Sequence, residues 1–277
     1  MWQDCDEQFR SASEVIEEFC KEHKLPILAG SSGRGWSKFS TIQRCPQLYE
    51  FIHIKKEKPP TTSEALDTGS IYHAFHAVEF YSISTMDLQE YLLADNVNPK
   101  SVFDARRVYD AYLSHYEEDY LNVLAVEVPA VDPKTKFTCR YDAIARIEDP
   151  PNGYLKGTYV IEMKTAGKFD FATLDSWDLD GEILGEIALY DRAGMRKKFG
   201  PLQGVIIDIA GKQQTPQFHR TFVSPSSIKT ERHMRDLVIW EAQEKRYKKL
   251  GYFPRALNGC IGRYGTCGFY DVCRNEV

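Results

Sequence analysis

Several features that define common protein classes are missing from this chain of 277 residues. No apolar run approaches the roughly 20 residues of a membrane span, and the acidic N-terminal segment lacks the apolar core of a secretory signal. The glycine-rich stretch 30–35 lacks the Gly-Lys-Ser/Thr ending of a phosphate-binding loop. These absences predict a cytoplasmic protein with no membrane partner.

The chain also lacks an excess of positive charge, since its formal net charge is −5. Any binding of nucleic acid must therefore come from a local basic surface or from a metal ion. The hydrophobic share of 43% and the charged share of 27% are ordinary for a globular protein. We expect an N-terminal helix and linker over residues 1–36 and one main domain over residues 37–277.

An acid and a lysine end an apolar segment near the middle of the chain. Residues 157–161 are rich in β-branched and aromatic side chains and predict a strand. Because a strand alternates its faces, Glu162 and Lys164 point the same way and Met163 points the other way. A surface ion pair is the simplest interpretation of this pattern alone.

The preceding strand changes that interpretation. Residues 137–147 alternate, with Phe137, Cys139, Tyr141 and the following odd-numbered residues predicted on one face. The Asp-Pro-Pro-Asn-Gly sequence at 149–153 is typical of a turn, so the two strands predict an antiparallel hairpin. Asp142 then falls opposite Glu162. Two adjacent carboxylates resist joint ionisation unless a cation lies between them, and a divalent metal is the simple resolution.

At this point the chain resembles a known family. Asp142, followed one hairpin later by Glu162-Met163-Lys164, resembles the core motif of the PD-(D/E)XK nuclease superfamily. Three further features resemble its RecB-like iron–sulfur branch, which includes CRISPR-associated RecB-like exonucleases, the AddB nuclease domain and phage homologues. They are Gly69-Ser70-Ile71-Tyr72-His73 for a Gly-x-x-x-His motif, Glu186-Ile187-Ala188-Leu189-Tyr190 for Gln-x-x-x-Tyr, and Cys45, Cys260, Cys267 and Cys273 for four cluster ligands.

The resemblance implies an α/β fold with a mixed central β-sheet flanked by helices, a helical portion and a C-terminal iron–sulfur clasp. It implies Mn²⁺ or Mg²⁺ held by His73, Asp142, Glu162 and the main-chain carbonyl of Met163, with Lys164 acting on the attacking water. It implies a 4Fe-4S cluster on the four cysteines and a nucleic-acid contact by Tyr190 and Glu186. Glu127 and His76 are weaker candidates for the same acidic site.

Two departures from simple patterns keep alternatives open. Glu186 stands where the branch has Gln, and a carboxylate repels phosphate, so Glu186 is either a further metal contact or a sign that the alignment differs locally. The spacing Cys260-x₆-Cys267-x₅-Cys273 differs from the Cys-x₂₋₄-Cys pairs of zinc knuckles, whereas iron–sulfur ligands can be widely spread. Unlinked thiols remain the alternative. We interpret Cys139 as a core residue that faces away from Asp142.

Residue patterns predict the remaining elements. A proline at position 46 should divide the helix that starts near Ser37. Hydrophobic spacing and turn residues predict the following helices and strands. The helices cover residues 13–24, 66–81, 102–120, 180–198 and 227–249, and the strands cover residues 124–130, 204–210 and 217–223.

We therefore predict a metal-dependent deoxyribonuclease, an exonuclease that prefers single-stranded DNA or DNA ends and hydrolyses phosphodiester bonds. Its setting would be recombination, repair or CRISPR adaptation, with helicase, recombination or integration proteins as partners. One alternative is a non-catalytic iron–sulfur subunit for DNA binding or assembly. Another is a zinc-bound structural protein with no nucleic-acid role.

Overall fold

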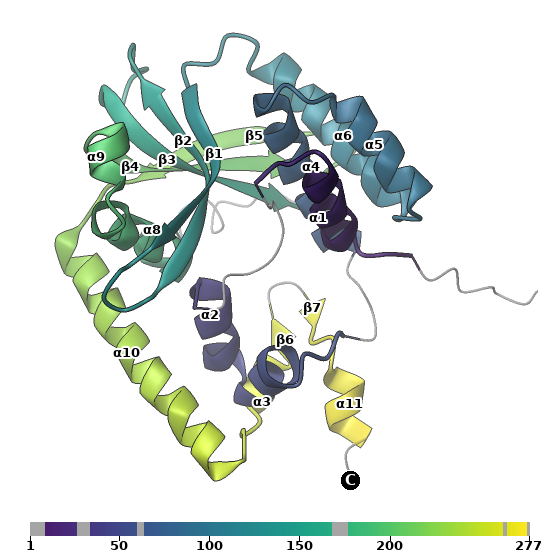
Figure 1. Ribbon diagram of the computed structural model, residues 1–277, viewed down its shortest axis with the longest axis vertical. Coiled ribbons are helices and arrows are strands. Elements are labelled where there is room, and N and C mark those ends of the chain that lie inside the picture. Colours follow the sequence, from purple (N-terminus) through teal and green to yellow (C-terminus); the bar gives the residue numbers. More distant parts are fainter. Residues whose placement is uncertain (1–8, 27–33, 60–63, 168–176, 263–264, 276–277) are drawn as a thin grey trace, which may run out of the picture.

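A five-stranded mixed β-sheet forms the centre of the upper part of the molecule in the computed structural model, which describes residues 9–26, 34–59, 64–167, 177–262 and 265–275 (Figure 1). Strand β3 is parallel to β4, and the other neighbouring strands are antiparallel. In spatial order the strands are β1 (Asn122–Val131), β2 (Thr138–Ile147), β3 (Gly157–Ala166), β4 (Leu202–Gly211) and β5 (Phe218–Val223).

The predicted hairpin of β2 and β3 is confirmed. Ala143 pairs with Ile161 and Ile144 pairs with Val160, so the next position along places Asp142 beside Glu162. The parallel neighbour β4 extends this apolar centre, because its residues 204–211 are all buried. Nearly continuous apolar sequence is typical of a strand that is covered on both faces.

Helices cover both faces of the sheet, as the resemblance implies (Figure 1). One group packs through Phe75, Val102 and Ile161 in what we call the α4-side core. The other packs through Val160, Leu189 and Ile207 in the α8-side core. The first group is α1 (Ala12–Glu22), α4 (Glu64–Phe80), α5 (Thr85–Ala94) and α6 (Pro99–His115), and the second is α8 (Gly181–Arg192), α9 (Met195–Phe199) and α10 (Ser227–Leu250).

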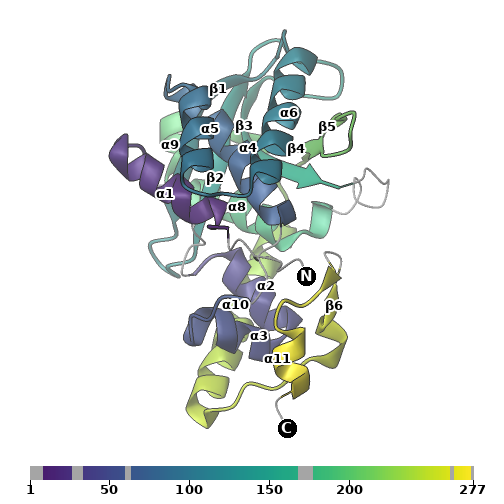
Figure 2. The same ribbon diagram turned by 90° about the vertical axis from the view of Figure 1, so that its right-hand side faces the viewer.

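A second lobe lies below the sheet and joins the early chain to the C-terminal segment (Figure 2). The predicted break at Pro46 is confirmed, since Cys45 has an extended backbone between two helices. The lobe contains α2 (Trp36–Arg44), α3 (Pro46–Tyr49), the π-helix η1 (Glu50–Ile54), the 3-10 helix η3 (Leu257–Gly259), β6 (Ile261–Gly262), β7 (Gly265–Thr266) and α11 (Tyr270–Asn275). A further 3-10 turn, η2 (Trp177–Leu179), precedes α8.

Three sequence-based predictions of elements need correction. The helix predicted over residues 180–198 is two helices, because Gly194, at φ +80°, interrupts the helical backbone between α8 and α9. The helix predicted over 102–120 starts at Pro99 and ends at His115. Helix α5 was not predicted, although Ser84 caps it by accepting hydrogen bonds from the amides of Met86 and Asp87.

The predicted face alternation of β2 is also wrong at one point. Ala143 belongs to the α4-side core, whereas Tyr141, two residues earlier, belongs to the α8-side core. On the partner strand Val126 and Val128 divide in the same way. The residue between them, Glu127, has φ +50°, so the pair of strands kinks where Glu127 faces Asp142.

No helix within the described ranges is both long and apolar enough to cross a membrane.

Candidate active site

Asp142 is held between helix α4 and strand β3. Its Oδ2 accepts a hydrogen bond from the Met163 amide at 2.8 Å, and Nδ1 of His73 lies 3.4 Å from the same oxygen. The hairpin register supplies the first contact and the approach of α4 supplies the second. His73 and Asp142, predicted from distant stretches of sequence, therefore meet.

The close approach of α4 depends on Gly69. A Cβ atom at this position would lie 3.0 Å from Oγ1 of Thr165 on β3, which is tighter than ordinary packing allows. His73 lies one helical turn further along and on the same side of α4 as Gly69. The glycine thus lets α4 bring the imidazole against the strand ends, as its motif predicts.

Lys164 links two acids, one from β3 and one from α8. Its Nζ donates to Oε1 of Glu162 and to Oε2 of Glu182, the latter at 2.6 Å. Glu182 comes from the first turn of α8, whose N-terminus Asp180 caps. Glu182 was missed in the sequence, because an acid in a first helical turn is usually explained by the helix dipole.

Burial and repulsion between carboxylates oppose ionisation of the acids around Asp142 and Lys164. Burial, followed by the charge of Asp142, raises the pKa of Glu162 to about 8. Burial also opposes ionisation of Asp142, but the charge and hydrogen bond of His73 outweigh it and hold the Asp142 pKa below its usual value. The pKa of His73 is raised despite burial, because Asp142 favours the imidazolium. A divalent cation would relieve the repulsion between the two acids.

Glu186 lies in the same acidic cluster. It is 2% exposed, and burial followed by the charge of Glu162 raises its pKa well above the ordinary value. Its Oε2 has no hydrogen-bond partner among the described residues. The raised pKa favours the neutral acid, and a neutral acid repels phosphate less than a carboxylate does.

The structure places Tyr190 away from this cluster. The ring is fully buried in the α8-side core, and its hydroxyl donates to the Gly200 carbonyl at 3.0 Å. The contact with nucleic acid that the resemblance implies for Tyr190 therefore stays a prediction. Tyr190 instead fixes the end of α9 against α8, one turn after Glu186.

The weaker candidates differ from each other. Glu127 is buried next to Asp142, pairs with Arg140 at 2.6 Å, and burial raises its pKa to about 7. His76 points into a group of tyrosine rings, and burial lowers its pKa to about 3. Glu127 thus belongs to the acidic surroundings of Asp142, whereas His76 packs with aromatic residues.

Cys139 packs with the core, as the sequence predicted. It packs against the α8-side core, close enough to Glu162 and Glu182 for their charges to affect it, and burial raises its pKa to about 12.

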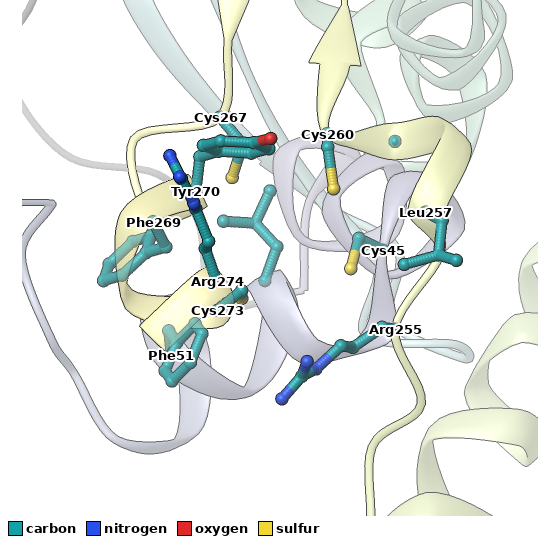
Figure 3. Close-up of a pocket in the computed structure, with 12 residues that line it drawn as sticks. Cys45, Phe51, Arg255, Leu257, Cys260, Cys267, Phe269, Tyr270, Cys273 and Arg274 are labelled. Atoms are coloured by element: carbon teal, nitrogen blue, oxygen red, sulfur yellow. The ribbon is translucent and has the colours of Figure 1, made fainter. Parts of the chain in front are cut away.

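The four predicted cluster ligands meet in the second lobe. Cys45, Cys260, Cys267 and Cys273 line one pocket of about 280 Å³ (Figure 3). The rest of the lining is largely apolar and includes Leu48, Phe51 and Phe269, while Arg255 and Arg274 stand at its edge. The Ala256 amide donates to Sγ of Cys45 at 3.5 Å. No disulfide joins the cysteines that the structure describes.

Neither the acidic cluster nor the cysteine pocket has the geometry of a closed site for a single metal ion. Among the described residues, no group of three or more His, Cys, Asp or Glu side chains is placed to hold one metal ion. The acids around Lys164 are instead occupied by its ammonium group. The thiols surround an open volume, and each ligand of a four-iron cluster binds a different iron.

Comparisons with known proteins give the fold. No protein-family model matches the chain, and no curated protein is similar enough in sequence to match. A solved structure from Eubacterium rectale, called "Putative exonuclease", is similar with a TM-score of 0.52 and 15% identity, over 98% of this chain and 94% of that one. The structure of SSO0001 matches with a TM-score of 0.34 and 12% identity, over 82% and 84%, which is too low to support an argument. The first likeness shows a shared fold over nearly the whole length.

Proposed function

We propose that this protein is a metal-dependent nuclease that hydrolyses phosphodiester bonds in DNA. The observation that carries the proposal is that four side chains lie together at one hairpin: His73, Asp142, Glu162 and Lys164. Asp142 is anchored there by the Met163 amide. The fold is shared with a protein called "Putative exonuclease", which supports the same class.

The donor set fits a hard divalent cation such as Mn²⁺ or Mg²⁺. His73, Asp142, Glu162 and the Met163 carbonyl supply one nitrogen and several oxygens, which such ions accept. Burial and the charge of Asp142 raise the pKa of Glu162 even though Lys164 lowers it, and a bound cation would favour the ionised pair of acids. When bound, a divalent ion acidifies water and neutralises charge on the scissile phosphate.

The residues of the chain have distinct tasks in this proposal. Lys164 stabilises negative charge as it develops on the phosphate oxygens and orients the water. Glu182 holds the ammonium group in place through the 2.6 Å contact. Neutral Glu186 donates a hydrogen bond much as an amide would, and so substitutes for the Gln of the related motif.

We further propose a 4Fe-4S cluster in the cysteine pocket. The supporting observation is that four thiols from the two ends of the chain line one largely apolar cavity. Such a cluster would connect Cys45 with the C-terminal segment and would stabilise the second lobe. Preference for single strands or DNA ends, exonuclease character and a role in recombination, repair or CRISPR adaptation belong to the same proposal.

The test is cleavage of end-labelled single-stranded DNA with Mn²⁺ or Mg²⁺ by protein purified without oxygen. Lys164→Ala should lose about 100- to 1000-fold in rate. Lys229→Ala is the matched control, because it removes a surface lysine whose ion pair is with Asp178, outside the acidic site, and it should cleave as wild type does. A wild-type protein that is folded, coloured and inactive would instead indicate a non-catalytic subunit.

A further inference from the structure

The outward face of helix α10 carries a stripe of cations. Its buried residues, Thr230, His233, Met234, Leu237 and Glu244, face the molecule. On the opposite side the exposed positions recur at helical spacing and are mainly basic or apolar. This stripe consists of Ile228, Arg232, Arg235, Ile239, Ala242, Arg246 and Lys249.

The four cations of the stripe have no ion-pair partner within the described ranges. The other lysines of α10 are neutralised, since Lys229, Lys245 and Lys248 pair with Asp178, Glu241 and Glu244. In a chain of net charge −5, unpaired cations gathered along one helix face are an electrostatic footprint for an anionic partner.

The cations form two pairs, one near each end of the helix. Arg232 and Arg235 form the first pair, and Arg246 and Lys249 form the second. Arg246 lies eleven positions after Arg235, which corresponds to about 16 Å along the helix axis. Ile239 and Ala242, between the pairs, are uncharged and exposed. The stripe therefore offers positive charge at two places with an uncharged gap between them.

This spacing suits the two phosphate backbones that border a major groove, which is about 12 Å wide. A single flexible strand has no need for a fixed gap of this size. We propose that the outward face of α10 binds duplex DNA by lying across its major groove, with each pair of cations on one backbone. The inference rests on the proposed function, because it places the duplex from which a single strand would reach the acidic site.

The two pairs are not equivalent. Glu231 and Asp236 are exposed beside the first pair, at distances beyond an ion pair, and they weaken its local potential. The second pair follows Lys245 and Lys248, whose acidic partners lie toward the body of the molecule. The second pair should therefore contribute more to binding.

Binding should be measured with a labelled 30-base-pair duplex in EDTA, so that no cleavage is needed. Arg246→Ala with Lys249→Ala should weaken duplex binding about tenfold at ~0.1 M salt and lower the slope of log K against log salt by about 2. Arg232→Ala with Arg235→Ala should have the same effect to a smaller degree. Alanine keeps the helix, which circular dichroism checks.

The matched control is Lys21→Ala with Lys100→Ala, which removes the same charge from exposed helix positions of α1 and α6. These helices lie across the sheet from α10 (Figure 1). The control should bind the duplex as wild type does, and all variants should cleave a single-stranded 30-mer at the wild-type rate.

Three results would overturn the inference: no duplex binding by the wild type, equal weakening in the control, or equal weakening for single-stranded DNA. An acidic protein would then be the better partner for this face. Absence of cleavage by the wild type would refute the proposed nuclease, while the EDTA measurement would still report on α10.

Discussion

The acidic cluster around Lys164 and the cysteine pocket are held in place in opposite ways. The first is fixed by the sheet, since Asp142 accepts from a backbone amide and Glu162 lies on a strand between two others. The second is formed by short elements from residues 45–51 and 255–274 around an apolar cavity. The comparison teaches that contacts within the sheet order the acidic site, whereas the pocket would gain most from the cluster proposed for it.

The largest effect on stability is expected when one of the four cysteines is removed from the pocket. Cys45→Ser should remove the brown absorption near ~400 nm and lower the melting temperature by more than about 10 °C, because structural metal sites contribute on the order of 10 kcal/mol. Absorption spectra, iron content and thermal unfolding of anaerobically purified protein are the measurements.

Cys139→Ser is the control for this variant, since Cys139 lies on β2 near the acidic cluster and not in the pocket. It should keep its iron and its colour. A wild-type protein without iron, or a Cys45→Ser variant with a full iron complement, would show that the pocket holds no such cluster.

An intermediate effect on stability is expected at Glu244, where α10 joins the second lobe. Burial alone would raise the pKa of Glu244, but hydrogen bonds from Lys248, Tyr49 and Lys38 lower it from 4.5 to about 2. Tyr49 donates to Oε1 at 2.6 Å, and Lys38 lies 2.9 Å from Oε2. Because the pKa is lower in the folded state, this stabilisation is complete above about pH 4.5 and is lost as the pH falls toward 2.

Glu244→Gln should therefore lower the unfolding free energy by about 2–3 kcal/mol at pH 7. The difference from wild type should shrink between pH 4.5 and pH 3, as followed by thermal unfolding. Glu231→Gln, an exposed acid on the same helix, is the control and should change little at any pH. A Glu244→Gln deficit that stays constant with pH would contradict the ionic explanation.

The smallest effect is expected at Glu186. Burial, then the charge of Glu162, raises the pKa of this side chain and favours its neutral form, so an amide of the same shape should replace it closely. Glu186→Gln should change the unfolding free energy by less than about 1 kcal/mol and the cleavage rate by less than about threefold. A large loss of cleavage with unchanged stability would show that a carboxylate is needed there.

The sequence predicted the hairpin well because its signals are local. The turn at 149–153 and the apolar strands determine the register, and the register alone brings Asp142 to Glu162. Cys45 and Pro46 likewise mark the break between α2 and α3. In each case a short stretch of residues carries the information.

The features that the sequence did not predict depend on contacts between distant elements or on unusual backbone angles. The strand kink at Glu127, where Tyr141 and Ala143 divide between the two cores, depends on a positive φ at a non-glycine residue and leaves no sequence pattern. The contact of Glu182 with Lys164 depends on how α8 packs against β3. Tyr190 was assigned by resemblance, and its burial follows from the same packing.

The most direct test of the acidic site is Asp142→Asn in the Mn²⁺-dependent cleavage of end-labelled single-stranded DNA. Asparagine keeps an oxygen that accepts the Met163 N–H but removes the charge, so it separates local structure from metal binding. The account predicts cleavage by the wild type only with a divalent ion, and no cleavage by Asp142→Asn at an unchanged melting temperature. Wild-type cleavage in EDTA, or cleavage by Asp142→Asn at the wild-type rate, would contradict it.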